Sequence, residues 1–118
     1  MDGLIIKKHW LDLILSGKKT WEIRGSNTKK RGEIALIESG SGMVVGVCDL
    51  VDSHPVTLDD IEHNTDKHQI EPDLVTITHH LQYKYPHAWV LKNVWEIVPK
   101  RYKHPQGAVI WVKNVLTN

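Results

Sequence analysis

Apolar positions at the start of the chain change from a continuous run to a helical repeat and then to alternation. Residues 4–6 read L-I-I, which predicts a short strand. An amphipathic helix is expected over residues 8–16, and Gly17 stands where a helix C-cap glycine belongs. Residues 19–24 then predict a second strand. The apolar residues at helical spacing are Trp10, Leu11, Ile14 and Leu15.

After these elements the pattern predicts further strands separated by turns, with helices inserted between some of them. Thr57 is a candidate N-cap within the polar stretch 54–72, and another helix is expected from residue 72 to near residue 83. A shift in alternation near Asn93 predicts a β-bulge. The expected strands are residues 33–37, 43–51, 88–98 and 108–112, with a loop at 99–107.

About six strands with helices inserted at two places favour an antiparallel or mixed β-barrel over a doubly wound parallel sheet. The expected fold class is therefore α+β, a mixed barrel of about six strands flanked by two or three helices. At 118 residues the chain is expected to form a single domain, 1–118, whose core needs neither a metal nor a disulfide.

The strand at residues 19–24 carries two kinds of face. Alternate residues of a strand point to opposite sides, so Trp21 and Ile23 are expected to face the core. The opposite face holds Thr20, Glu22 and Arg24, directly after Lys19. A hydroxyl, an acid and a base in one row can line a polar site, and the alternative is a solvated Glu–Arg ion pair on an exposed strand.

Each of these polar groups has a chemical role in a ligand site. The planar fork of Arg24 suits a phosphate or a carbonyl group. Glu22 can accept a hydrogen bond from the exocyclic amine of a base. Lys19, once desolvated, has a lowered pKa and can act as a base or nucleophile, and Lys18 is the alternative if the strand is shifted by one residue. Lys19, Thr20 and Glu22 are the candidate catalytic residues.

The charge balance excludes a strong nonspecific nucleic-acid binder, because the formal net charge is only +1. The basic residues are nevertheless unevenly placed, and an asymmetric surface can bind a polyanion. The candidate binding rim consists of Lys29, Lys30 and Arg31 together with Lys100, Arg101 and Lys103. Tyr102 lies between two of these cations, in a position suited to stacking on an unpaired base. The five tryptophans are expected to be mostly core residues.

Neither a cofactor nor a membrane attachment is expected. The single cysteine, Cys48, lies in an apolar strand where inert thiols are found, and a reducing cytoplasm is the default location. No stretch resembles a membrane span or a signal peptide. The eight histidines do not follow a zinc-ligand spacing, so no metal is expected. His54, His63, His68 and His104 are alternative acid–base or phosphate-binding groups.

Four segments match the pattern of a known family. Residues 17–24, G-K-K-T-W-E-I-R, match a G-x-K-x-x-E-x-R motif. The other segments are 31–36 (R-G-E-I-A-L), 44–50 (V-V-G-V-C-D-L), and 89–91 with 105–111 (W-V-L and P-Q-G-A-V-I-W). In this order and spacing they resemble the ASCH domain family, in particular its small stand-alone bacterial-type members, over nearly the whole chain.

The resemblance implies a PUA-like barrel with a cleft between the barrel and the first helix, lined by Lys19, Thr20, Glu22 and Arg24. It implies binding of RNA or of a nucleoside or nucleotide. Some bacterial members deacetylate N(4)-acetylcytidine with a lysine, threonines and a later glutamate. In this chain Glu22 replaces the second threonine, and Glu62 or Glu71 is the candidate for the later glutamate.

Three functions follow as alternatives. The leading hypothesis is an RNA- or nucleotide-binding protein, and the second is a hydrolase, either an amidohydrolase on N(4)-acetylcytidine or a metal-independent ribonuclease. The third is a regulatory interaction module, since the family is named after a transcriptional coactivator. The sequence leaves the preferred base and the oligomeric state open.

Overall fold

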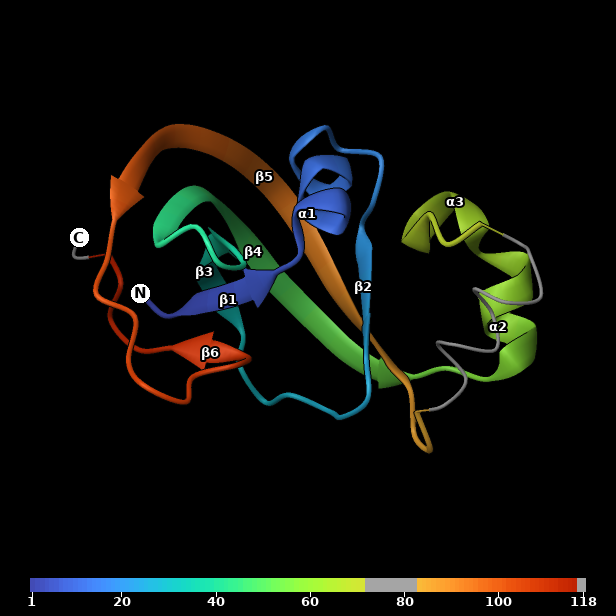
Figure 1. Ribbon diagram of the computed structural model, residues 1–118. Coiled ribbons are helices and arrows are strands. Elements are labelled where there is room, and N and C mark those ends of the chain that lie inside the picture. Colours follow the sequence, from blue (N-terminus) through green and yellow to red (C-terminus); the bar gives the residue numbers. More distant parts are fainter. Residues whose placement is uncertain (72–82, 117–118) are drawn as a thin grey trace.

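The computed structural model describes residues 1–71 and 83–116, which form one curved six-stranded sheet and three helices (Figure 1). The strands are β1 (Gly3–Ile6), β2 (Trp21–Arg24), β3 (Gly32–Glu38), β4 (Met43–Pro55), β5 (His87–Arg101) and β6 (Trp111–Val112). The helices are α1 (Lys8–Leu15), α2 (Leu58–His63) and α3 (Thr65–His68). The helix predicted from residue 72 lies outside the described residues.

The sheet is mixed and runs in the order β2-β5-β4-β3-β1-β6. The β1–β3 pair is parallel and the other pairs are antiparallel, so the prediction of a mixed α+β fold is confirmed. The long strands β4 and β5 curl around the molecule, and α1 lies beside β5 (Figure 1). Met1 and Leu116 are hydrogen-bonded at 2.9 Å, which places the two ends of the described chain together. No helix in residues 1–71 or 83–116 is long and apolar enough to cross a membrane.

Several predicted boundaries are wrong because strand pairing extends or shortens the elements. β4 continues to Pro55, and β5 continues to Arg101, because the two strands pair with each other over almost their whole length. Lys100 and Arg101 are therefore strand residues rather than loop residues. The last strand shrinks to Trp111–Val112, since only these residues pair with β1.

The predicted β-bulge in β5 is confirmed. Val47 pairs with Trp95 and Asp49 pairs with Lys92, so β5 has one extra residue at this point. Asn93 adopts a left-handed conformation there (φ 54°) and donates a 2.7 Å hydrogen bond to Asp49 Oδ2. The expectation that Trp95 is a core residue is wrong: it is 66% exposed, because the extra residue changes which side chains point outward.

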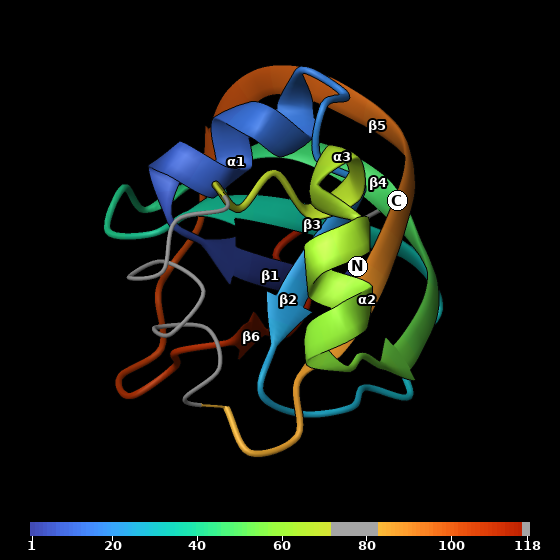
Figure 2. The same ribbon diagram turned by 90° about the vertical axis from the view of Figure 1, so that its right-hand side faces the viewer.

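Both faces of β2 are covered. Ile23 packs with Ile61 of α2 and with Ile70, and Trp21 lies against the same cluster, as predicted for that face. The main core, which includes Leu11 of α1 and Trp89 of β5, lies inside the curved sheet. Figure 1 places α2 and α3 beyond β2, and in Figure 2 the two helices lie in front of that strand. These two helices cover the Trp21–Ile23 face, whereas the polar face of β2 is largely covered by β1 and Trp89, which contact Arg24.

A Schellman motif joins α1 to β2. Gly17 has φ 83°, and its N–H donates to Ile14 O, while Lys18 N–H donates to Leu13 O. The prediction that Gly17 terminates the helix is confirmed. The Lys19 N–H also donates to Leu13 O, so the chain reverses tightly and enters β2 with the Lys19 side chain directed inward.

Candidate functional site

Lys19, Glu22 and Arg24 form one connected charge cluster, the charge triad. Glu22 Oε1 lies 3.6 Å from Lys19 Nζ, and Glu22 Oε2 lies 2.9 Å from Arg24 Nη2 and 3.2 Å from Arg24 Nε. The exposed fractions of the three side chains are 1% for Lys19, 7% for Glu22 and 17% for Arg24. The interpretation of Glu22 and Arg24 as a solvated surface pair is therefore wrong. Two cations around one carboxylate leave the triad with a net positive charge.

The Lys19 ammonium is held from three directions. Its Nζ donates a 2.6 Å hydrogen bond to the main-chain carbonyl of His68, at the end of α3, and lies 4.7 Å from the ring centroid of Trp10. The third contact is with Glu22. Burial lowers the pKa of Lys19 from 10.5 to about 8, partly offset by the nearby Glu22 carboxylate. Lys18 is exposed, so Lys19 is the lysine that the strand brings into the cluster.

Arg24 is fixed along one edge of its guanidinium. Nε and Nη2 bind Glu22, and Nη2 also donates a 2.8 Å hydrogen bond to Ile5 O of β1. The guanidinium carbon lies 5.6 Å from the ring centroid of Trp89. All hydrogen bonds from Arg24 to residues 1–71 and 83–116 come from Nε and Nη2, and none comes from Nη1. A partly exposed Arg24 thus has two donor hydrogens directed away from its fixed edge.

Aromatic rings continue from the charge triad toward β6. Trp89 and Trp111 stack with centroids 5.8 Å apart and an angle of 15° between the ring planes. Lys30 Nζ lies 4.9 Å from the Trp111 ring centroid and 2.6 Å from Asp2 Oδ2. Among the predicted rim residues, Lys30 is therefore linked to the triad through two stacked rings.

The other predicted rim residues lie elsewhere. Arg31 is 3.8 Å from Asp52, and Lys29 is exposed in the segment that precedes β3. Arg24 pairs with His87 at one end of β5, whereas Arg101 stands at the other end of this strand (Figure 1). Lys100, Lys103 and Tyr102 adjoin Arg101, and the Tyr102 hydroxyl is 2.9 Å from His104 Nδ1. The structure therefore does not bring this second basic group together with the triad.

Thr20 lies at the edge of an open groove of about 460 Å³ between the end of α1 and β5. Its main chain is fixed by two hydrogen bonds, from Thr20 N–H to Lys67 O of α3 and from Leu91 N–H to Thr20 O. Lys19 and Lys92 also line this groove, whereas Glu22 and Arg24 do not. Of the four predicted cleft residues, Thr20 therefore lies at the groove, Glu22 and Arg24 lie in the triad, and Lys19 belongs to both.

Among the candidate histidines, only His68 is buried. Its Nδ1 accepts a 2.9 Å hydrogen bond from Ile70 N–H, and its Nε2 lies 2.6 Å from Ile61 O. One acceptor and one donor nitrogen correspond to a neutral ring protonated on Nε2. The sequence pattern did not show that the carbonyl of His68 contacts Lys19, because the two residues are 49 positions apart.

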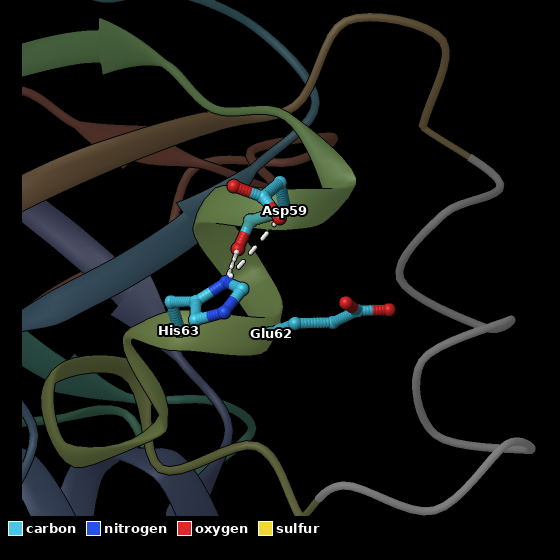
Figure 3. A group of neighbouring side chains, drawn as sticks. All are labelled: Asp59, Glu62 and His63. Carbon is cyan, nitrogen blue, oxygen red and sulfur yellow. Dashed lines mark hydrogen bonds and ion pairs between the residues drawn. The ribbon is translucent and has the colours of Figure 1, made fainter.

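Asp59, Glu62 and His63 gather on the surface of α2 (Figure 3), with side-chain ligand atoms within 4.8 Å of one another. His63 Nδ1 already contacts Asp59, at 2.8 Å from the main-chain oxygen and 3.4 Å from Oδ1. These contacts with Asp59 raise the pKa of His63. Asp59 and His63 therefore form an exposed ion pair on the helix surface. Glu62 and Glu71, the candidates for a later catalytic glutamate, are both exposed.

Comparisons with known proteins agree with this architecture. Crystal structures of an ASCH protein from Zymomonas mobilis and of a tyrosine-to-phenylalanine mutant of it superpose with TM-scores of 0.69 and 0.70, at 15% sequence identity. The match covers 89% of this chain and 82% and 85% of those chains. No curated protein matches the chain significantly. The family model of the ASCH domain matches residues 4–101, and the chain is therefore a member of the ASCH domain family with the family's PUA-like α+β fold.

Proposed function

We propose that this protein binds RNA or a nucleotide through the charge triad, with Arg24 as the group that contacts the ligand. The observation that carries the proposal is the fixed guanidinium: Glu22 and Ile5 O hold one edge, and Nη1 remains available on a partly exposed side chain. A pre-oriented Arg can donate from its remaining nitrogen, Nη1, to a phosphate oxygen or a base carbonyl at a low entropic cost. The ASCH family assignment supports the same ligand class.

Glu22 and Lys19 would complete base recognition. An ionised carboxylate accepts hydrogen bonds only, which suits an exocyclic amine such as cytosine N4. Lys29, Lys30 and Arg31 would contact the phosphates that follow, since Lys30 is linked to the triad through Trp111 and Trp89. Arg101, Tyr102 and Lys103 would contact a longer strand at the far end of β5.

Fluorescence anisotropy with labelled single-stranded RNA tests the binding proposal. The wild-type protein should bind with an affinity that falls as salt rises, because phosphate contacts release counterions. Arg24→Gln should weaken binding at least tenfold, whereas Lys8→Gln removes a positive charge from α1 outside the triad and should change it little. Salt-independent binding, or equal affinities for the two variants, would contradict the proposal.

A second candidate function is hydrolysis of N(4)-acetylcytidine, and the lowered pKa of Lys19 is the observation that favours it. A neutral Lys19 amine would take a proton from water, and the resulting hydroxide would add to the acetyl carbonyl. Cleavage of the amide C–N bond, with a proton returned to N4, would yield cytidine and acetate. Thr20 would lie beside this chemistry at the groove edge.

Chromatographic detection of cytidine separates this hydrolase activity from binding alone. Turnover by the wild type and by Lys18→Ala, and none by Lys19→Ala, would support the hydrolase, because only Lys19 belongs to the triad. Absence of cytidine at high enzyme concentration would exclude this activity. A metal-independent ribonuclease would instead shorten labelled RNA in the presence of a chelator.

A further inference from the structure

The end of α3 contacts the charge triad through its main chain. Two consecutive carbonyls of this helix accept hydrogen bonds from two consecutive residues of the strand entry. His68 O accepts from Lys19 Nζ at 2.6 Å, and Lys67 O accepts from Thr20 N–H at 2.8 Å. A cation at a helix C-terminus is electrostatically favourable. The position of this helix end therefore decides where the Lys19 ammonium stands.

The position of the helix end depends on the ring of His68. The chain reverses at Gln69, which adopts a left-handed conformation (φ 59°) that is uncommon for a residue other than glycine. The His68 ring spans this reversal: Nδ1 accepts from Ile70 N–H, and Nε2 contacts Ile61 O within α2. Ile61 and Ile70 are both buried beside Ile23 of β2. One side chain thus joins α2, the reversal and the core.

We propose that His68 is a positioning residue of the charge triad: its ring places its own main-chain carbonyl on Lys19 and keeps the ammonium beside Glu22. The inference rests on the proposed function only in that Lys19 belongs to the site. His68 does not touch the ligand. A neutral ring with one donor and one acceptor is required, because loss of either hydrogen bond frees one side of the reversal.

The titration of Lys19 tests this role without any ligand. In protein labelled with ¹³C at lysine Cε, the Lys19 resonance is assigned by its absence from Lys19→Met. In the wild type it should titrate near pH 8. In His68→Leu the carbonyl moves off the ammonium, which by itself lowers the pKa of Lys19, and water reaches the amine, which raises it. Burial is the largest cause of the lowered pKa, so rehydration should dominate and the pKa should rise by about one unit or more toward 10.5. His63→Gln, a change at an exposed histidine of α2, should keep the wild-type value.

Two conservative variants keep the test valid if His68→Leu does not fold. His68→Asn retains an acceptor near Ile70 N–H, and His68→Gln retains a donor near Ile61 O, so each should raise the pKa of Lys19 less than the loss of both contacts does. A wild-type titration of Lys19 in both folded variants would overturn the proposal. The RNA assay is a separate readout: no binding by the wild type would refute the proposed function, while a raised Lys19 pKa in the His68 variants would still support the positioning role.

Discussion

Lys19 and Glu22 are three residues apart in the sequence and bring opposite charges to 3.6 Å on side chains that are only 1% and 7% exposed. Because the backbone turns into β2 between them, Lys19 reaches the end of α3 and Glu22 reaches Arg24. The pair thus joins a helix end, the first turn after α1 and an edge strand of the sheet. Its members are structural neighbours and, in the proposed function, parts of one ligand site.

Removal of the Lys19 side chain should destabilise the fold. The buried Glu22 carboxylate would keep only Arg24 as an ion-pair partner, and His68 O would lose its hydrogen bond from Lys19 Nζ. Breaking a buried ion pair from one side costs about 3 kcal/mol or more. Lys19→Ala should lower the free energy of unfolding by that amount in urea. Lys18→Ala removes an exposed neighbour and should change it by less than about 0.5 kcal/mol. Equal effects of the two variants would contradict the buried network.

The stability contributed by Lys19 should rise with pH. Its pKa is about 8 in the folded protein and 10.5 in the unfolded chain, so the unfolded state binds more protons between these values. Stability gained from this group is present above pH 10.5 and is lost as pH falls through 8. At about 1.4 kcal/mol per pH unit, the gap amounts to about 3 kcal/mol.

The measurement for this pH effect compares wild type with Lys19→Met by denaturant unfolding at about pH 7 and pH 10.5. The free energy of unfolding of the wild type should gain about 3 kcal/mol relative to the variant between these two values. Other lysines and tyrosines titrate in both proteins, so their contribution cancels in the difference. A difference that stays constant across this range would show that Lys19 has an ordinary pKa in the folded state.

Substitution of Arg24 by lysine should reduce RNA binding even though the charge is retained. A lysine ammonium cannot hold Glu22 and Ile5 O with one edge and offer two donors with another. Affinity should fall by about tenfold in the anisotropy assay, which is about 1.4 kcal/mol. The unfolding curve of Arg24→Lys serves as the control for an intact fold. Wild-type affinity in this variant would show that Arg24 acts as a charge alone.

Cys48 should be unreactive in the native protein. Burial raises the pKa of its thiol to about 12, and a thiolate is the reactive form. A chromogenic disulfide reagent at about pH 8 should label it only as fast as the protein unfolds. In denaturant the reagent should count one thiol per chain, the single cysteine of the sequence. Rapid labelling of the native protein would contradict the buried position of Cys48 in β4.

Helix positions could be predicted from residues close together in the sequence. The apolar repeat of residues 8–16 and the glycine at 17 encode α1 and its Schellman end, because hydrogen bonds close within a few residues there. Thr57 and Asp60 likewise form a capping box at the start of α2. Strand lengths were predicted less accurately from the sequence. The end of β5 is set by pairing with Met43, the first residue of β4, and not by a turn residue within β5 itself.

The sequence by itself determined that Lys19, Glu22 and Arg24 share one short segment and that their strand has a polar face. Only the tertiary structure decided that this face is covered, because Arg24 lies against Ile5 O of β1 and the ring of Trp89, and the end of α3 reaches Lys19 from far along the chain. Burial and the carbonyl of His68 then convert three charged side chains into a network with a lowered Lys19 pKa. Strand length likewise separates Arg101 from Arg24, because Arg24 pairs with His87 at the start of the 15-residue strand β5 and Arg101 is the last residue of that strand. Contacts between residues dozens of positions apart depend on packing, and hydrophobic periodicity records only which face of an element is covered.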